Sequence, residues 1–219
     1  MKTATEKHID NLIQRYPDLY ICRDTIIEAL QLLICCYKKI NNKVLICGNG
    51  GSAADAQHIV GELMKAFVLP RKLSKDKQLE IQKNFPNSSQ YLIDNLQDVL
   101  PAVSLLGETA LTSAYANDKA PDLVFAQQVL GLGNENDVLF AISTSGTSRN
   151  VLYACEVAKI QKMKIIGLTG LSGGKMKDIC DVTICAPSDI TYQIQEYHLP
   201  IYHAICLALE EEFFGEEPN

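Results

Sequence analysis

The sequence predicts an α/β protein built on a doubly wound sheet of five parallel strands. Short, continuous apolar runs recur along the chain, as expected for strands that are buried on both faces. Segments with the apolar spacing of helices separate these runs, which indicates crossover connections between parallel strands. The length of 219 residues fits one such domain with a helical appendage.

The elements follow one another in a regular order. The predicted strands are 43–47, 101–106, 137–142, 164–168 and 182–185. A helix is expected from the glycine-rich stretch at 48–52 to about residue 67, and further helices at 108–116, 123–131, 150–162 and 195–213. The total of five strands predicts a doubly wound sheet, which binds ligands at the carboxyl ends of its strands.

Two parts of the chain stand outside this alternation. Amphipathic helices are predicted at 4–16 and 23–40, so residues 1–40 form an N-terminal helical part and residues 41–219 the α/β domain. These helices either serve as oligomerisation arms or only cover the sheet. The polar segment 68–100 interrupts the domain as an insertion, either a plain surface excursion or a flap near the ligand.

Composition limits the classes of function. The net charge of −6 argues against a nucleic-acid-binding face, while a phosphorylated small molecule can still be held by backbone amides at helix N-termini. No apolar run approaches the length that spans a bilayer, and no signal peptide is recognised at the N-terminus. The eight cysteines form no Cys-x-x-Cys pair and lie mostly in apolar runs, so we expect a cytoplasmic protein.

Two loops with small residues connect a predicted strand to a predicted helix. The first contains Asn49, Gly50, Gly51 and Ser52, where glycines allow the backbone to approach a ligand closely. The second, STSGTS at 143–148, has hydroxyl groups at five of its six positions. Either loop alone could be an ordinary turn with a helix cap. Two such loops at the ligand-binding edge of a sheet indicate a phosphate site.

A second set of residues could ligate a metal ion. His58 and Glu62 are four residues apart on one predicted helix and therefore share a face. Gln195 and His203 are eight apart on the last helix, with Pro200 between them, so a bend or a subunit contact is needed to bring them together. Spacing alone favours a surface pair and a partly buried histidine over a metal site.

These residues also carry a resemblance to a known family. The run CGNGGSAADAQH at 47–58, Glu62, STSGTS at 143–148, GLTG at 167–170, GGKM at 173–176 and IQEYHLPIYH at 194–203 occur in the family's order. Together they resemble the phosphoheptose isomerase branch of the sugar-isomerase (SIS) family, over most of residues 20–214. The resemblance implies a SIS fold, helical arms and a homotetramer with active sites at subunit contacts.

The resemblance also implies a reaction and a set of site residues. The expected reaction converts sedoheptulose 7-phosphate into a heptose 7-phosphate through a metal-assisted enediol, with one Zn²⁺ per subunit. Glu62 and His203 match the acid–base pair of the family. The other matches are the metal ligands His58, Glu62, Gln195 and His203, and the substrate-binding residues Asn49, Gly50, Gly51, Ser52, Asp118, Ser143, Thr144, Ser145, Ser148 and Gln195.

Three departures from the family pattern leave the identity of the sugar open. Lys65-Ala66 stands where the family usually has a Gly-Arg pair, Tyr192 stands where an aspartate is common, and the insertion 68–100 is longer. Two alternatives remain at this point. One is a non-catalytic SIS protein that senses a sugar phosphate or associates with replication initiators. The other is a different phosphosugar enzyme of the same fold.

Overall fold

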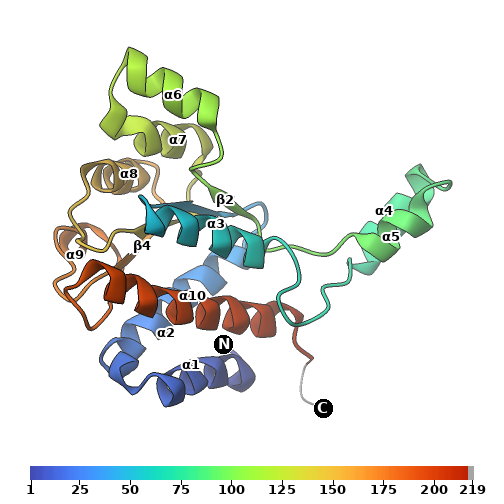
Figure 1. Ribbon diagram of the computed structural model, residues 1–219. Helices are drawn as coiled ribbons and strands as arrows, with labels where there is room; N and C mark the ends of the chain where they lie inside the picture. Colours follow the sequence, from blue (N-terminus) through green and yellow to red (C-terminus); the bar gives the residue numbers. More distant parts are fainter. Residues whose placement is uncertain (217–219) are drawn as a thin grey trace.

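The computed structural model describes residues 1–216 and contains one parallel sheet (Figure 1). Its strands are β1 (Val44–Cys47), β2 (Ala102–Ser104), β3 (Val138–Ile142), β4 (Lys164–Thr169) and β5 (Val182–Cys185). Their order across the sheet is β2-β1-β3-β4-β5, and every neighbouring pair is parallel. The predicted fold class of five parallel strands is therefore confirmed.

Helices cover both faces of this sheet. They are α1 (Thr3–Arg15), α2 (Arg23–Tyr37), α3 (Gly51–Leu63), α6 (Thr109–Asp118), α7 (Val124–Leu132), α8 (Arg149–Ile160), α9 (Met176–Ile179) and α10 (Thr191–Phe214), with short 3₁₀ helices η1 (Pro17–Cys22) and η2 (Pro121–Leu123). Alternate side chains of β1 enter different cores. Val44 and Ile46 pack with α2, α3 and α10, whereas Leu45 and Cys47 pack with α7 and α8 on the other face.

The N-terminal helices share the core of the α/β domain. Ile26, Leu30 and Leu33 of α2 are buried in the same cluster as the strands, and α1 packs along α10. Within a single chain, α2 therefore covers part of one face of the sheet, and α1 packs outside it against α10. Tyr20 and Ile21 of η1 are 71% and 70% exposed. Whether these helices also join subunits stays a prediction.

The insertion 68–100 forms a helical arm, defined here as α4 (Lys75–Asn84) and α5 (Ser89–Asn95) with their connections. Figure 1 shows the arm standing away from the sheet, beyond the end of α3. Neither helix contains a buried residue. The base of the arm is closed by a hydrogen bond of 2.8 Å from the Asp98 amide to the Arg71 carbonyl.

Two helices differ from the prediction in an informative way. The helix expected to reach about residue 67 ends at Leu63, because the Arg71 guanidinium donates to the carbonyls of Glu62 and Leu63 and caps the last turn. Pro200 lies inside the continuous helix α10 and is buried there. None of the helices in the described part of the chain is long and apolar enough to cross a membrane.

Candidate active site

The two small-residue loops meet at the carboxyl edge of the sheet. The strands that precede them, β1 and β3, are direct neighbours, and the strand order reverses between them. This switch point is where open α/β sheets leave a crevice for a ligand. Each loop leads into the N-terminus of a long helix, α3 or α8, so backbone amides of both helices converge on the crevice.

Hydroxyl groups dominate the second loop. The Ser143 and Ser148 hydroxyl oxygens are 3.0 Å apart, and the Thr147 hydroxyl donates to the Ser145 oxygen at 3.0 Å. Gly146 has a φ of +63°, and a Cβ at this position would lie 2.1 Å from the Gly173 carbonyl oxygen. The backbone of the neighbouring GGKM segment therefore fixes the shape of the loop, and only glycine fits.

The first loop is tied to α8 by a pair of asparagines. The amide nitrogens of Asn49 and Asn150 each donate to the oxygen of the other side chain, at 2.9 and 2.8 Å. Both side chains line a cavity of about 470 Å³, together with residues of α6, α7 and the segment after β2. Asn150 was not among the predicted site residues. Its position in the first turn of the helix after STSGTS was the available signal.

Asp118 lies apart from these groups. It is exposed at the end of α6, and its side chain accepts a hydrogen bond of 2.9 Å from Asn117. Gln195 instead lies beside the first loop, because a Cβ on Gly51 would fall 2.5 Å from its amide nitrogen. The structure thus joins Gln195 to the glycine-rich loop and leaves Asp118 at the rim.

The predicted acid–base residues lie farther along α3 and α10. His58 Nε2 is 3.2 Å from Glu62 Oε1, and the rings of His58 and His203 meet edge to face with centroids 4.9 Å apart. His203 also lines a cavity of about 360 Å³ between α1 and α10. Helices that are distant in the sequence therefore bring Glu62 and His203 to one place.

The surroundings of His203 favour its neutral form. Burial lowers the pKa of this imidazole, and the nearby His58 lowers it further. Its Nε2 atom is buried and has no hydrogen-bond partner in the described residues. A neutral imidazole with an unused nitrogen can exchange a proton with a substrate oxygen or bind a cation.

The predicted metal ligands fit zinc in chemistry but are not gathered into one cluster. No group of three His, Cys, Asp or Glu side chains within residues 1–216 is arranged to hold a metal ion. The 3.2 Å between His58 Nε2 and Glu62 Oε1 is close to the ~3.4 Å edge of a tetrahedron with bonds of about 2.1 Å. His203, with its unpartnered nitrogen, is the nearest further donor, whereas Gln195 lies two turns away beside Gly51.

Comparison with known proteins agrees with this fold. A family model described as "SIS domain" matches residues 92–170. The chain is 42% identical to a phosphoheptose isomerase of Nitratiruptor sp. over 82% of this chain and 83% of that one. It is also 42% identical to a phosphoheptose isomerase of Campylobacter jejuni, over 88% and 89% of the two chains. A solved phosphoheptose isomerase from Francisella tularensis aligns with a TM-score of 0.73 and 31% identity, covering 96% of this chain and 100% of that one.

The reversed strand order, with two small-residue loops at the switch point, defines a protein of the SIS class. Within that class, the chain belongs to the phosphoheptose isomerase family. The family predicted from the sequence motifs is thereby confirmed.

Proposed function

We propose that this chain is an aldose–ketose isomerase that converts sedoheptulose 7-phosphate into a heptose 7-phosphate. The observation that carries the proposal is the position of two chemically different groups at the two ends of α3. The hydroxyl-rich loops lie at its N-terminus, and Glu62 with His203 lies toward its C-terminus. Similar proteins of Nitratiruptor and Campylobacter are phosphoheptose isomerases.

The separation along α3 suits a long sugar. Ser52 and Glu62 are ten residues apart, which corresponds to ~15 Å of helix rise. A seven-carbon chain with a terminal phosphate, together with the reach of the side chains at both ends, can bridge this distance. A three-carbon sugar phosphate cannot touch both ends at once. The phosphate end then supplies binding energy that fixes the reacting carbons.

The phosphate is assigned to the two loops. The hydroxyls of Ser143, Ser145 and Ser148 can donate to its oxygens, and the N-termini of α3 and α8 favour its negative charge. Asn49 and Asn150 face the cavity beside the loops and are suited to sugar hydroxyls. No net positive charge is needed in such a site, which agrees with the acidic chain.

Glu62 and His203 are assigned to the proton transfers. Isomerisation moves one proton between adjacent carbons and another between their oxygens. In this proposal Glu62 takes the carbon proton and the neutral His203 serves the oxygens; the proximity of the two residues and the lowered pKa of His203 support it. Lys65 Nζ lies 3.2 Å from the other oxygen of Glu62.

We assign the metal requirement to His58, Glu62 and His203, with Gln195 as a further ligand. A bound Zn²⁺ supplies polarisation of the substrate carbonyl. His203 Nε2 is the atom whose lack of a partner supports this assignment. We also propose that the protein is a homotetramer. We further propose that it is located in the cytoplasm, which is consistent with eight cysteines that are all unpaired.

Incubation of the purified protein with sedoheptulose 7-phosphate, with and without added Zn²⁺, tests the proposal. We expect an aldose phosphate to accumulate, and we expect Glu62→Gln to abolish it while the protein still binds the sugar phosphate. A matched set of shorter ketose phosphates tests the length argument. Equal turnover of a triose and a heptose phosphate would contradict it, and no turnover of any phosphosugar would contradict the proposed function.

A further inference from the structure

Tyr202 contacts both His58 and Asp55, and neither Tyr202 nor Asp55 was among the site residues expected from the sequence. The Tyr202 hydroxyl oxygen is 3.0 Å from His58 Nδ1 and 3.3 Å from Asp55 Oδ1. Tyr202 is only 1% exposed, and its ring packs edge to face against His58 with centroids 5.5 Å apart. Together with Glu62, these residues form one continuous polar chain between α3 and α10.

The direction of the hydrogen bonds follows from counting protons. The Tyr202 hydroxyl has one proton and two neighbours that could accept it, Asp55 and His58. Among residues 1–216, Tyr202 is the one hydrogen-bond donor that reaches the Asp55 carboxylate, whose Oδ2 atom is already buried without a partner. Leaving both carboxylate oxygens without a donor would be costly, so the tyrosine proton goes to Asp55.

This assignment fixes the tautomer of His58. Because the Tyr202 proton is used by Asp55, its oxygen can only accept, and the proton at this contact must come from His58 Nδ1. The Nε2 atom of the neutral ring then carries a lone pair and faces Glu62 Oε1 at 3.2 Å. Two acceptors at that distance repel each other unless a proton or a cation lies between them. These hydrogen-bonded residues therefore form a site between His58 Nε2 and Glu62 Oε1 that favours a cation or a proton.

We propose that Asp55 and Tyr202 are positioning residues that hold the His58 imidazole as its Nδ1–H tautomer, with Nε2 directed at Glu62. The role in catalysis rests on the proposed function, whereas the tautomer does not. Fixing the ring in this way prepares His58 to bind a cation together with Glu62, and it orients both groups for the substrate. Neither residue touches the reacting atoms.

The direct test is ¹⁵N nuclear magnetic resonance of the metal-free full chain labelled in its four histidines, at mildly alkaline pH where imidazole is neutral. We expect the His58 signals of a protonated Nδ1 and an unprotonated Nε2. In Asp55→Ala the tyrosine proton is released to His58, so the tautomer should switch to Nε2–H. In Tyr202→Phe the constraint disappears, and both tautomers should be populated.

Tyr197→Phe is the matched control. Tyr197 lies on the same helix and its hydroxyl also donates to an aspartate, Asp18, at 3.0 Å, but outside the site. It should leave the His58 tautomer, zinc affinity and kinetics unchanged. Tyr202→Phe should weaken zinc binding, measured by competition with a chromogenic chelator, by about 10- to 100-fold, and lower kcat more than it raises KM.

The outcomes separate this inference from the proposed function. An Nε2–H tautomer in the unmodified protein overturns the inference, even if no variant folds. An unchanged tautomer in Asp55→Ala also overturns it. Absence of isomerase activity in the unmodified protein contradicts the proposed function and leaves the tautomer result valid. Normal activity of the unmodified protein, with equal zinc affinity and kcat in Tyr202→Phe, contradicts the positioning role alone.

Discussion

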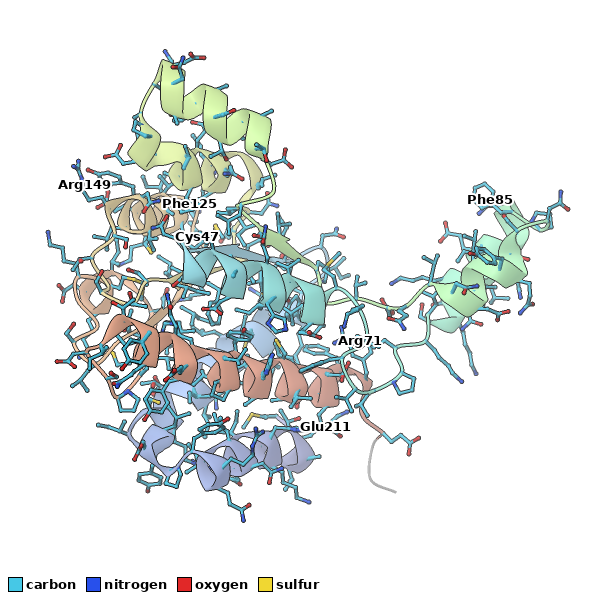
Figure 2. The ribbon with its side chains drawn as sticks, viewed as in Figure 1. Cys47, Arg71, Phe85, Phe125, Arg149 and Glu211 are labelled. Carbon is cyan, nitrogen blue, oxygen red and sulfur yellow. The ribbon has the colours of Figure 1, made fainter. Side chains whose placement is uncertain are left out.

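Replacement of Arg71 should destabilise the whole domain, because this buried guanidinium holds together three parts of the chain. Its side chain and that of Glu210 are 0% and 1% exposed. Arg71 donates to Glu210 at 2.8 Å and to the carbonyls of Leu63 and Glu62 at 2.6 and 3.0 Å. Figure 2 shows Arg71 between the ends of α3 and α10, at the base of the arm.

The expected cost follows from what Arg71→Met leaves behind. Methionine keeps much of the apolar stem but leaves the Glu210 carboxylate buried without its cation. Removal of one partner of a buried ion pair costs about 3–5 kcal/mol. The two carbonyls at the end of α3 lose their donors as well. The decrease in the free energy of unfolding should therefore lie toward the upper end of that range. This is a large part of the ~5–15 kcal/mol that stabilises a typical domain.

Urea denaturation followed by circular dichroism measures this change. Arg23→Met is the control, because Arg23 also contacts a carboxylate at 2.8 Å but Asp10 is 57% exposed, and such surface pairs contribute about 0–1 kcal/mol. The double variant Arg71→Met/Glu210→Met removes both charges and should be less destabilised than the sum of its single changes. A loss below about 1 kcal/mol in Arg71→Met would refute the reasoning.

The same pair predicts a dependence of stability on pH. Burial opposes ionisation of Glu210, but the amides of Phe67, Val68 and Leu69 and the Arg71 guanidinium outweigh it and lower the pKa of this carboxyl. A folded-state pKa below the unfolded value means that the contribution is present above the ordinary pKa of about 4.5 and is lost as the pH falls through the folded pKa. Urea unfolding measured as the pH falls below about 4.5 tests it, and Glu210→Met should flatten that part of the stability profile.

Three further predictions concern the substrate, a buried histidine and the arm. Ser145→Ala combined with Ser148→Ala should raise KM for the sugar phosphate while affinity for the unphosphorylated sugar stays constant; equal losses for both would refute the phosphate assignment. Burial lowers the pKa of His198 to about 4. The free energy of unfolding should therefore be highest above about pH 6.5 and should fall as the pH drops toward 4. His198→Gln should remove this pH dependence in urea unfolding. Replacement of residues 72–98 by a short linker should leave the melting temperature nearly unchanged, because neither arm helix buries a residue, whereas a change in KM across a sugar panel would assign the arm to the site.

Much of the fold could be predicted because its strands are buried on both faces. Runs such as 137–142 are apolar at almost every position, which distinguishes them from amphipathic helices. The arm could not be placed, since α4 and α5 form without contributing to a core. The end of α3 was also missed, because Arg71 caps it from eight positions away through a tertiary contact.

The site divides in the same way. His58 and Glu62 are close for a local reason, their four-residue spacing on one helix, and the sequence reveals that spacing. Tyr202 and Asn150 are partners of site residues that are 144 and 101 positions away in the chain. The sequence places Asn150 just after STSGTS and Tyr202 next to His203, but it does not show which side chains they contact. Their roles depend on how α10 and α8 pack against the first loop and its helix.

Under the proposed function, the packing of α3 against α10 sets the length of the sugar phosphate that the site accepts. The two helices are joined at three successive levels: Gly51 lies beside Gln195, His58 contacts Tyr202, and Arg71 links the end of α3 to Glu210. The first two levels are seven residues apart on both helices, which is ~10 Å of rise along each. Because the contacts have the same spacing on both helices, the helices cannot slide past one another without breaking all three. Under the proposed function, these contacts fix the distance between the loops assigned to the phosphate and the residues assigned to the proton transfers, so a sugar phosphate of the wrong length would lose its contacts at one end.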